Sequence, residues 1–262
     1  MNVVYRFRIY PNKIQQELFA KTFGCVRFVY NRMLAEKKEC YEKTGKNLKV
    51  TPAKYKEEFP WLKEVDSLAL ANAQLNLQIA YNNFFRDKSI GFPKFKSKHH
   101  DRKSYTTNNQ KGSIRLIDDK TVRLPKLQNV RIKLHRQLPQ DSIIKSATIS
   151  QSPTGKYYIS ILVEFEKNIK PITPTIETVL GLDYSSKSLY IDSESVSAEY
   201  PRFYRKAETK LKKAQRKLSK RQNGSKNRDK QRRKVAKLHE KVSNQRKDFL
   251  HKLSKQITNA SS

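Results

Sequence analysis

The sequence predicts an α+β protein, in which an antiparallel sheet or small barrel with an inserted helical module precedes a long, basic, antiparallel helical hairpin. Three observations indicate this class. VVYRFRIY, residues 3–10, alternates apolar and basic side chains with the period of a half-buried strand. Short strand-like runs recur between residues 104 and 166. The chain beyond Pro201 follows a helical period and is strongly basic.

The first strand stops at Pro11, and helical spacing follows it. Apolar residues after Asn12 recur at helical intervals, and we expect this helix to be broken or bent near Gly24. A second helical stretch, residues 67–85, carries one broad apolar face. Because both stretches lie between the first strand and the later ones, residues 11–103 are expected to form an inserted helical module.

The sequence predicts short strands in the middle of the chain. The runs are SIRLI (113–117), NVRIKLH (129–135), SATISQS (146–152) and KYYISILVEF (156–165), the last two joined by Pro-Thr-Gly. We expect residues 1–10 and 104–170 to form one mainly antiparallel β domain. KNIKPITPTIE, with two prolines, marks a boundary before a third region, residues 171–262.

The third region ends in a predicted helical hairpin over residues 203–258. Apolar side chains recur at alternating steps of three and four, which is the pattern of a coiled-coil seam. The seam positions are Tyr204, Ala207, Leu211, Ala214 and Leu218 on the first helix, and Val235, Leu238, Val242, Gln245, Phe249 and Leu253 on the second. Asn223-Gly224-Ser225 breaks the pattern and lets the helices fold back antiparallel.

The net charge of the chain limits the partners that we expect for it. Lys and Arg number 56 against 24 Asp and Glu, a net charge of +32, which favours nucleic acid as the first partner and an anionic membrane surface as the second. The sequence contains no run of eighteen apolar residues that could span a bilayer, and the N-terminus does not resemble a signal peptide. We therefore expect a soluble, cytoplasmic protein.

Several kinds of site are not expected. Two cysteines, Cys25 and Cys40, are too few for a disulfide framework or a four-cysteine zinc site. The five histidines form no metal-ligand pattern, and the seven glycines form no phosphate-binding loop. No zinc is expected in this chain.

Two basic segments are candidate nucleic-acid contacts. In the first, cations for phosphates alternate with rings that could stack on bases, or pack in the core; its residues are Phe92, Lys94, Phe95, Lys96, Lys98, Arg102, Lys103 and Tyr105. The second is the hairpin, where 21 Lys and Arg face 4 Asp and Glu between Arg202 and Lys252. Its candidates are Lys212, Lys213, Arg216, Lys220, Arg221, Arg228, Arg232 and Arg233. The alternative is a solvated surface in both cases.

One acid, Asp183, follows a short apolar run and could be a catalytic metal ligand or a residue that caps a turn. Phosphodiester cleavage of the two-metal type needs several carboxylates around ions about 4 Å apart. A hairpin turning at Ser185-Ser186 would pair Asp192 near Val179, on the order of 13 Å from Asp183. The partner acids are therefore not visible in this chain.

These motifs together resemble the TnpB/OrfB family of insertion-sequence transposon proteins, RNA-guided RuvC-type nucleases related to type V CRISPR effectors. YRFRIYPNKIQQELFAKTFGCVRFVYNRML is similar to the family's N-terminal segment, and FFRDKSIGFPKFKSK to one of its central blocks. GLDYSSKSLYIDS resembles the first RuvC motif, with Ser185 where the family commonly has glycine. The basic helices resemble the region that follows it.

The resemblance implies an RNA-binding, wedge-like β domain with an inserted recognition module, followed by a RuvC-like nuclease domain that uses Mg²⁺. Guide RNA and DNA are the implied partners, and Asp183 is the one family acid that carries over. KQITNASS ends before the expected second acid, the four-cysteine module and the last Asp. We expect a truncated member that is not a nuclease alone. The alternatives are a nuclease-dead repressor that binds RNA or DNA, and a non-functional remnant of a transposon gene.

Overall fold

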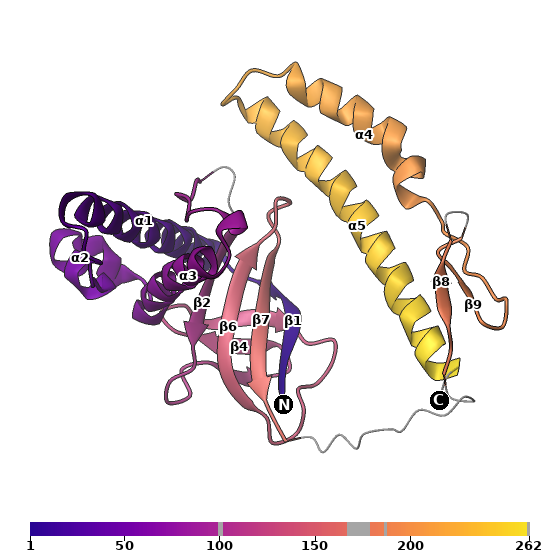
Figure 1. Ribbon diagram of the computed structural model, residues 1–262, viewed down its shortest axis with the longest axis horizontal. Helices are drawn as coiled ribbons and strands as arrows, with labels where there is room; N and C mark the ends of the chain where they lie inside the picture. Colours follow the sequence, from indigo (N-terminus) through magenta and orange to yellow (C-terminus); the bar gives the residue numbers. More distant parts are fainter. Residues whose placement is uncertain (99–101, 167–178, 186–187, 261–262) are drawn as a thin grey trace. The chain divides into compact units, whose positions relative to one another are not determined.

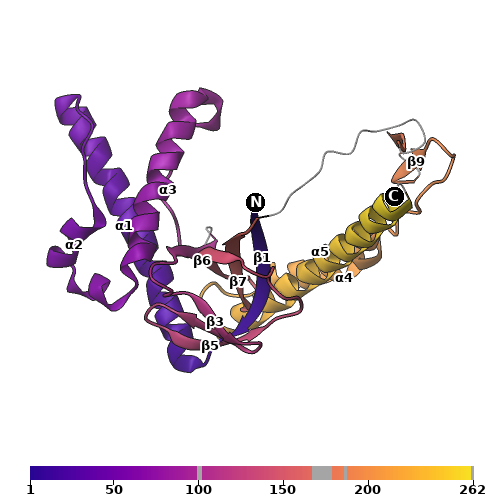
Figure 2. The same cartoon turned by 90° about the horizontal axis from the view of Figure 1, so that it is seen from below.

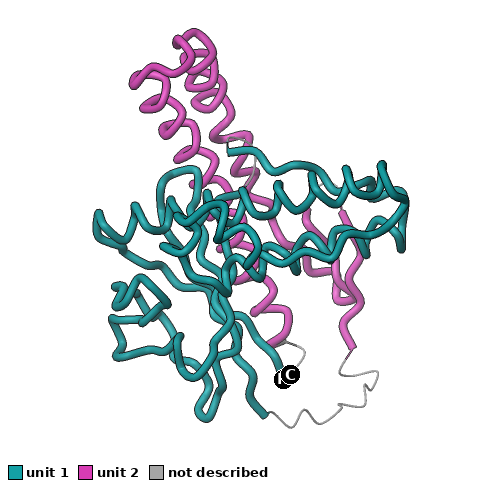
Figure 3. The backbone as a smooth tube through the Cα atoms, turned by 90° about the vertical axis from the view of Figure 1, so that its left-hand side faces the viewer, with its two compact units in different colours: residues 1–167 teal, residues 168–262 magenta. Residues whose placement is uncertain are grey.

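The computed structural model describes residues 1–98, 102–166, 179–185 and 188–260 (Figure 1). The chain divides into two compact units, residues 1–167 and residues 168–262, which Figure 3 distinguishes by colour.

The first unit is built on a seven-stranded sheet in which every neighbouring pair is antiparallel. Its strands are β1 (Asn2–Tyr10), β2 (Lys103–Asn108), β3 (Arg115–Asp118), β4 (Thr121–Leu124), β5 (Gln128–Lys133), β6 (Ile143–Gln151) and β7 (Tyr157–Glu164). The order across the sheet is β2-β6-β7-β1-β5-β4-β3. The predicted combination of helices with an antiparallel sheet is confirmed, and the N-terminal strand lies inside that sheet (Figure 1).

Helices occupy the chain between β1 and β2. They are α1 (Lys13–Thr44), α2 (Pro52–Glu58), the 3-10 helix η1 (Pro60–Glu64), α3 (Ser67–Arg86) and the 3-10 helix η2 (Lys88–Ile90). Figure 2 shows α1 and α3 side by side. The chain enters α1 through a capping box, in which Asn12 and Gln15 satisfy each other's backbone N–H groups.

Of the two alternatives expected near Gly24, a break or a bend, the break is wrong, because α1 runs without interruption from Lys13 to Thr44. A single glycine inside a helix costs about 1 kcal/mol relative to alanine. The neighbours Phe23, Cys25 and Val26 are all buried. Their burial outweighs that cost.

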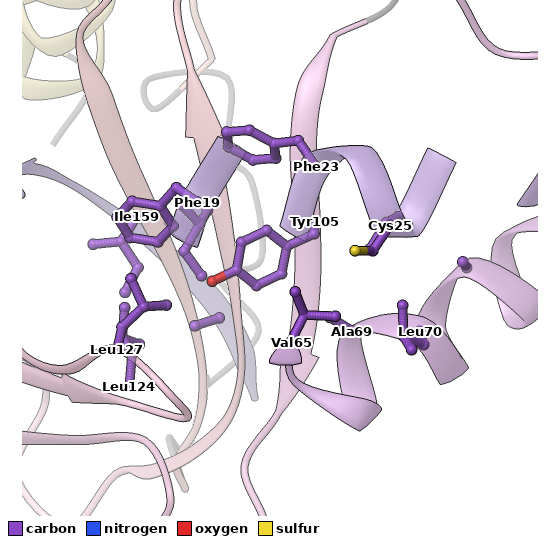
Figure 4. Packing of buried hydrophobic residues seen from close by; sticks show 14 of the residues in the cluster. Phe19, Phe23, Cys25, Val65, Ala69, Leu70, Tyr105, Leu124, Leu127 and Ile159 are labelled. Atoms are coloured by element: carbon purple, nitrogen blue, oxygen red, sulfur yellow. The ribbon is translucent and has the colours of Figure 1, made fainter. Parts of the chain in front are cut away.

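The core of the first unit joins the helices to the sheet (Figure 4). Phe19 of α1 stacks on Tyr157 of β7 with ring centroids 5.4 Å apart, and it lies 6.3 Å from Tyr105 of β2. Asp66 fixes α3 to the same sheet, because its carboxylate accepts from the backbone N–H of Leu68 and from the hydroxyl of Thr107.

The second unit contains a two-stranded sheet and two long helices. The elements are β8 (Leu182–Tyr184), β9 (Tyr190–Asp192), α4 (Phe203–Ser219) and α5 (Lys226–Ala260). The helices are antiparallel, since Gln231 and Arg228 of α5 donate to the carbonyls of Ala214 and Leu218 of α4.

The seam between α4 and α5 buries Leu211, Val235 and Val242 and leaves most other predicted positions half-buried. Two predicted seam residues, Tyr204 and Gln245, are exposed instead. Tyr204 lies in the first turn of α4, where Arg246 covers its ring at 6.0 Å.

Within the parts of the chain that the structure describes, no helix combines the length and the apolar character needed to cross a bilayer.

Candidate nucleic-acid interface

One face of α4 is a cationic groove of about 490 Å³, lined by Thr209, Lys212, Lys213, Arg216, Lys217 and Lys220. Steps of three and four residues place these side chains on one side of the helix. Lys212 is paired with Glu208 at 2.8 Å, and hydrogen bonding to that carboxylate raises the pKa of Lys212. Among the described residues, no carboxylate lies within ion-pair distance of the other four cations. We define these six residues as the α4 face.

The seam explains why these charges face outward. Leu211 is buried against α5, and the cations before and after it in sequence project away from that contact. The two helices can pack only if their charged sides remain exposed. Like charges three or four residues apart on such a side repel one another by a few tenths of a kcal/mol per pair. Bound phosphate would relieve this repulsion.

Besides Lys212, two further hairpin candidates have structural partners. Arg228 is half-buried, and its Nη1 donates to the carbonyls of Leu218 and Arg221 at 2.9 and 2.8 Å. It satisfies carbonyls at the C-terminus of α4, where a positive charge is favourable. Arg228 therefore locks the hairpin, a structural role that the sequence alone did not indicate. Arg232 pairs with Asp229 at 3.3 Å, while Arg221 and Arg233 are exposed.

The basic segment after η2 divides into anchoring and exposed residues. Lys96 has its ammonium 4.0 Å from the ring centroid of Tyr30, and its backbone exchanges two hydrogen bonds with the side chain of Asn31. Lys94 and Lys98 on either side of it are exposed. The segment is thus held at its middle lysine and presents the two flanking lysines to solvent.

The aromatic candidates of this segment differ in exposure. Phe95 is exposed, and Phe92 is exposed although its edge contacts Tyr81 and Phe84. Tyr105 is only 4% exposed, and burial raises the pKa of its hydroxyl. Tyr105 is therefore a core residue, so its burial favours the packing role over the stacking role, the two alternatives expected from the sequence. The neighbouring cations Arg102 and Lys103 are exposed.

A cluster of arginines and tyrosines on the sheet was not among the sequence candidates. Arg6 and Arg8 of β1 have guanidinium carbons 4.2 and 5.1 Å from the ring centroid of Tyr158. Arg8 is also 5.3 Å from the ring of Tyr10, and Arg131 is 5.8 Å from it. The alternation in VVYRFRIY already places both arginines on the side opposite Phe7, but only the strand register reveals their aromatic partners.

The β8–β9 hairpin corrects the sequence expectation for Asp192. Leu182 lies opposite Asp192 and Asp183 opposite Ile191, so the turn is longer than one centred on Ser185-Ser186. Asp192 is thus much nearer to Asp183 than the expected pairing with Val179 implied. Because directly opposed residues share a face, the two carboxylates still lie on opposite faces of the hairpin. The carboxylate of Asp192 accepts from the backbone N–H groups of Glu194 and Val196.

The surroundings of Asp183 do not fit a two-metal site. Its side chain is exposed, and the residue opposite it is Ile191. Over residues 1–98, 102–166, 179–185 and 188–260, no group of three or more His, Cys, Asp or Glu side chains could hold a metal ion. Carboxylates that bridge two ions must share one side of the site. No catalytic step through Mg²⁺ follows from these residues.

Sequence comparisons identify similar proteins. A profile of OrfB proteins of IS605 elements, described as a probable transposase, matches residues 160–262, and a related profile, described as a helix-turn-helix domain, matches residues 1–46. The chain is 33% identical over 265 residues to a putative RNA-guided DNA endonuclease of Streptomyces pristinaespiralis. It is 32% identical over 263 residues to the putative RNA-guided DNA endonuclease InsQ of Escherichia coli K12. Both alignments cover 97% of this chain and 63% of the relative.

Among solved structures, the fold resembles Cas12f1 in a cryo-EM structure of a Cas12f1–sgRNA–target DNA complex. The TM-score is 0.57 at 11% identity, over 98% of this chain and 78% of Cas12f1. Residues 1–46, matched by the helix-turn-helix profile, form one strand and one long helix here, β1 and α1, with a short loop at the end.

Proposed function

Because the chain belongs to the TnpB/OrfB family of insertion-sequence transposon proteins, we propose that it binds a guide RNA and the DNA to which such a guide pairs. The observation that carries this proposal is the α4 face, four of whose five cations have no acidic partner among the described residues. Lys212 and Lys220 are eight residues apart, so the face extends over roughly 12 Å of helix. A nucleic-acid backbone supplies phosphates over such a length.

The segment around Lys94 and Lys98 provides the second surface of this proposal. Its exposed lysines suit phosphates, and the exposed rings of Phe92 and Phe95 suit unpaired bases. In this assignment, residues 1–10 and 104–170 are a wedge-like β domain and residues 11–103 its inserted helical module. Residues 171–262 are the start of a RuvC-like domain.

The α4 face is tested by replacing Lys213, Arg216 and Lys220 with glutamine. Loss of three phosphate contacts lowers the slope of log K against log salt by about 2 for a single strand and about 3 for a duplex. The control changes three exposed lysines of the first unit, Lys46, Lys49 and Lys63, to glutamine. If the test and control triples behave alike, the α4 face has no special role and the proposal fails.

We further propose that this chain does not cut DNA by itself. Asp183 has no second carboxylate on its face of the β8–β9 hairpin among the described residues. Its activity would then be that of a nuclease-dead binding module, which occupies a DNA site as a repressor does. The chain spans 63% of the length of the curated relatives it matches. Cleavage is therefore to be tested on this chain rather than carried over from them.

The test incubates the purified protein and its guide RNA with Mg²⁺ and target DNA. We expect a protein–RNA–DNA complex and intact DNA. Guide-dependent cleavage that is lost in Asp183→Ala would refute the binding-only function. Absence of any RNA or DNA binding would instead favour a non-functional remnant.

A further inference from the structure

Guanidinium groups and tyrosine rings alternate in one row across three strands of the first unit. The order is Arg6, Tyr158, Arg8, Tyr10 and Arg131, and each successive cation–ring distance lies between 4.2 and 5.8 Å. Each tyrosine ring lies within reach of two guanidinium groups. Such contacts stabilise by about 0.5–1 kcal/mol each at exposed sites. The row therefore holds three cations in fixed positions.

The strand register produces this arrangement. Arg8 lies opposite Tyr158 of β7 on one side and opposite Lys133 of β5 on the other, and Tyr10 lies opposite Arg131. The intervening residues Phe7 and Ile9 are buried in the core. Because side chains alternate along a strand, the row and Lys133 lie on the sheet face that points away from that core. We call Arg6, Arg8, Tyr10, Arg131, Lys133 and Tyr158 the ladder face.

Arg8, at the centre of the row, lacks a hydrogen-bond acceptor for part of its guanidinium group. Its Nη1 atom is buried and has no hydrogen-bond partner among the described residues. A buried donor without an acceptor costs about 1–3 kcal/mol. The neighbouring rings offset only part of this cost. A negative charge on the remaining guanidinium edge would offset more, since hydrogen bonds to charged acceptors are roughly twice as strong as neutral ones.

Charge and spacing on this face fit a repeating anion. Arg6, Arg8, Arg131 and Lys133 form no ion pair within the described parts of the chain. Cations two residues apart on one strand are separated by about 6.8 Å, and neighbouring strands by about 4.8 Å. Hydroxyl donors adjoin the cations, because Ser160 lies opposite Arg6 and Ser150 opposite Tyr158. A single carboxylate would contact only one or two of these cations, whereas a chain of phosphates would contact several.

We propose that the ladder face binds the sugar–phosphate backbone of a nucleic acid, as a site separate from the α4 face. This inference rests on the proposed function and adds to it a third surface, on the sheet of the first unit. The rings orient the guanidinium planes, so the site recognises phosphate and is indifferent to base sequence. RNA and DNA share this chemistry, and the experiment distinguishes them.

The test measures binding of the full chain to a single-stranded RNA, the DNA strand of the same sequence, and the corresponding duplex, over a range of salt. The variant is Arg6→Gln with Arg8→Gln. Two lost contacts lower the salt slope for single strands by about 1.4 and weaken binding about 25-fold near 0.1 M salt. Lys46→Gln with Lys49→Gln removes the same charge from an exposed part of the same unit and leaves the slope unchanged.

The role of the rings has its own readout. In Tyr158→Phe the ring face remains, so binding stays at the wild-type level. In Tyr158→Leu the guanidinium groups lose their support, and affinity falls although no charge has changed. Equal binding by the Phe and Leu variants would show that the ring does not position the cations.

The outcomes separate this inference from the proposed function. If the α4 triple variant weakens binding while Arg6→Gln/Arg8→Gln matches wild type on all three probes, the ladder face is not a site. If wild type binds none of the probes, both proposals fall. The probe that loses most affinity identifies the ligand as RNA or DNA. Should the double variant unfold, Lys133→Gln with Arg6→Gln, both at exposed positions, replaces it with the same expected loss.

Discussion

The two units carry positive charge on scaffolds of different kinds. In the first unit, one buried cluster joins the sheet to α1 and α3, and acids such as Glu36 hold neighbouring cations, here Arg32 and Lys54 at 3.1 and 3.2 Å. In the second unit, the buried apolar side chains among the described residues are Leu211, Val235 and Val242. The first unit therefore has a core of its own, whereas the second depends on one narrow seam and on whatever neutralises its charge.

The β8–β9 hairpin extends this contrast. Leu182, Tyr184 and Ile191 remain 45–79% exposed on a sheet of two strands. A two-stranded sheet is marginally stable alone, because it has little opposing surface to bury. The large core of the first unit fixes the cations of the ladder face in place. The narrow seam between α4 and α5 instead leaves the stability of the hairpin dependent on a ligand that neutralises its cations.

The largest effect is expected in the core of the first unit. Phe19→Ala removes a fully buried ring and should destabilise that unit by about 3–5 kcal/mol, measured by chemical denaturation. Ile14→Ala on the same helix is the control, since Ile14 is 77% exposed and its loss should cost no more than about 0.5 kcal/mol. A small effect of Phe19→Ala would mean that the core does not carry the unit.

The second prediction breaks the seam. Leu211→Ala should cost the hairpin about 2–5 kcal/mol and shift the helical circular dichroism transition to lower temperature. Leu250→Ala, an exposed leucine of α5, should leave it in place.

The same variant shows whether the units unfold separately. Cys25 is buried in the first unit, and burial raises the pKa of its thiol to about 11, so it reacts slowly with thiol reagents while that unit stays folded. In Leu211→Ala its labelling should remain slow. Rapid labelling of Cys25 would show that the two units unfold together.

A smaller effect is expected at the hairpin turn. Arg228→Gln removes two hydrogen bonds to carbonyls at the end of α4 and should cost about 1–3 kcal/mol, seen as faster hydrogen exchange in the last turn of that helix. Arg233→Gln, at an exposed position of α5, removes the same charge and is the control. Equal exchange in both variants would rule out the locking role of Arg228.

The smallest effect concerns salt without any ligand. Added salt screens repulsion among Lys213, Arg216, Lys217 and Lys220, by a few tenths of a kcal/mol per pair. The hairpin should therefore melt at a higher temperature in high salt, while the melting temperature of the first unit changes less. A hairpin that loses stability in salt would indicate attraction among its side chains rather than repulsion.

Periodicity was sufficient to predict the elements with strong patterns. The alternation of residues 3–10 identified β1, and the seam spacing identified α4 and α5. β4 was missed because Thr121–Leu124 is too short to display a period. The low helix propensity of glycine favours a break at Gly24, but α1 continues through it because the residues around it are buried.

The candidate site was predictable in composition but less so in geometry. Sequence identified four of the five cations of the α4 face, since helical spacing groups them on one side, but Lys217 was not among the candidates. It could not distinguish Arg228, whose partners are main-chain carbonyls of the preceding helix, nor Tyr105, which faces α1. The ladder face depends on which residues of β5 and β7 lie opposite β1, and no local pattern encodes that pairing.

The position of β1 also determines when the first unit can be completed. Residues 2–9 of β1 pair with residues 157–164 of β7, two segments far apart in the sequence, and the backbone N of Met1 donates to the carbonyl of Phe165. During synthesis, β1 can therefore complete its pairing only after β7 has been made, and association with other chains competes with folding until then. Any segment joined directly to Met1 would lie beside this late-forming contact and would slow its formation.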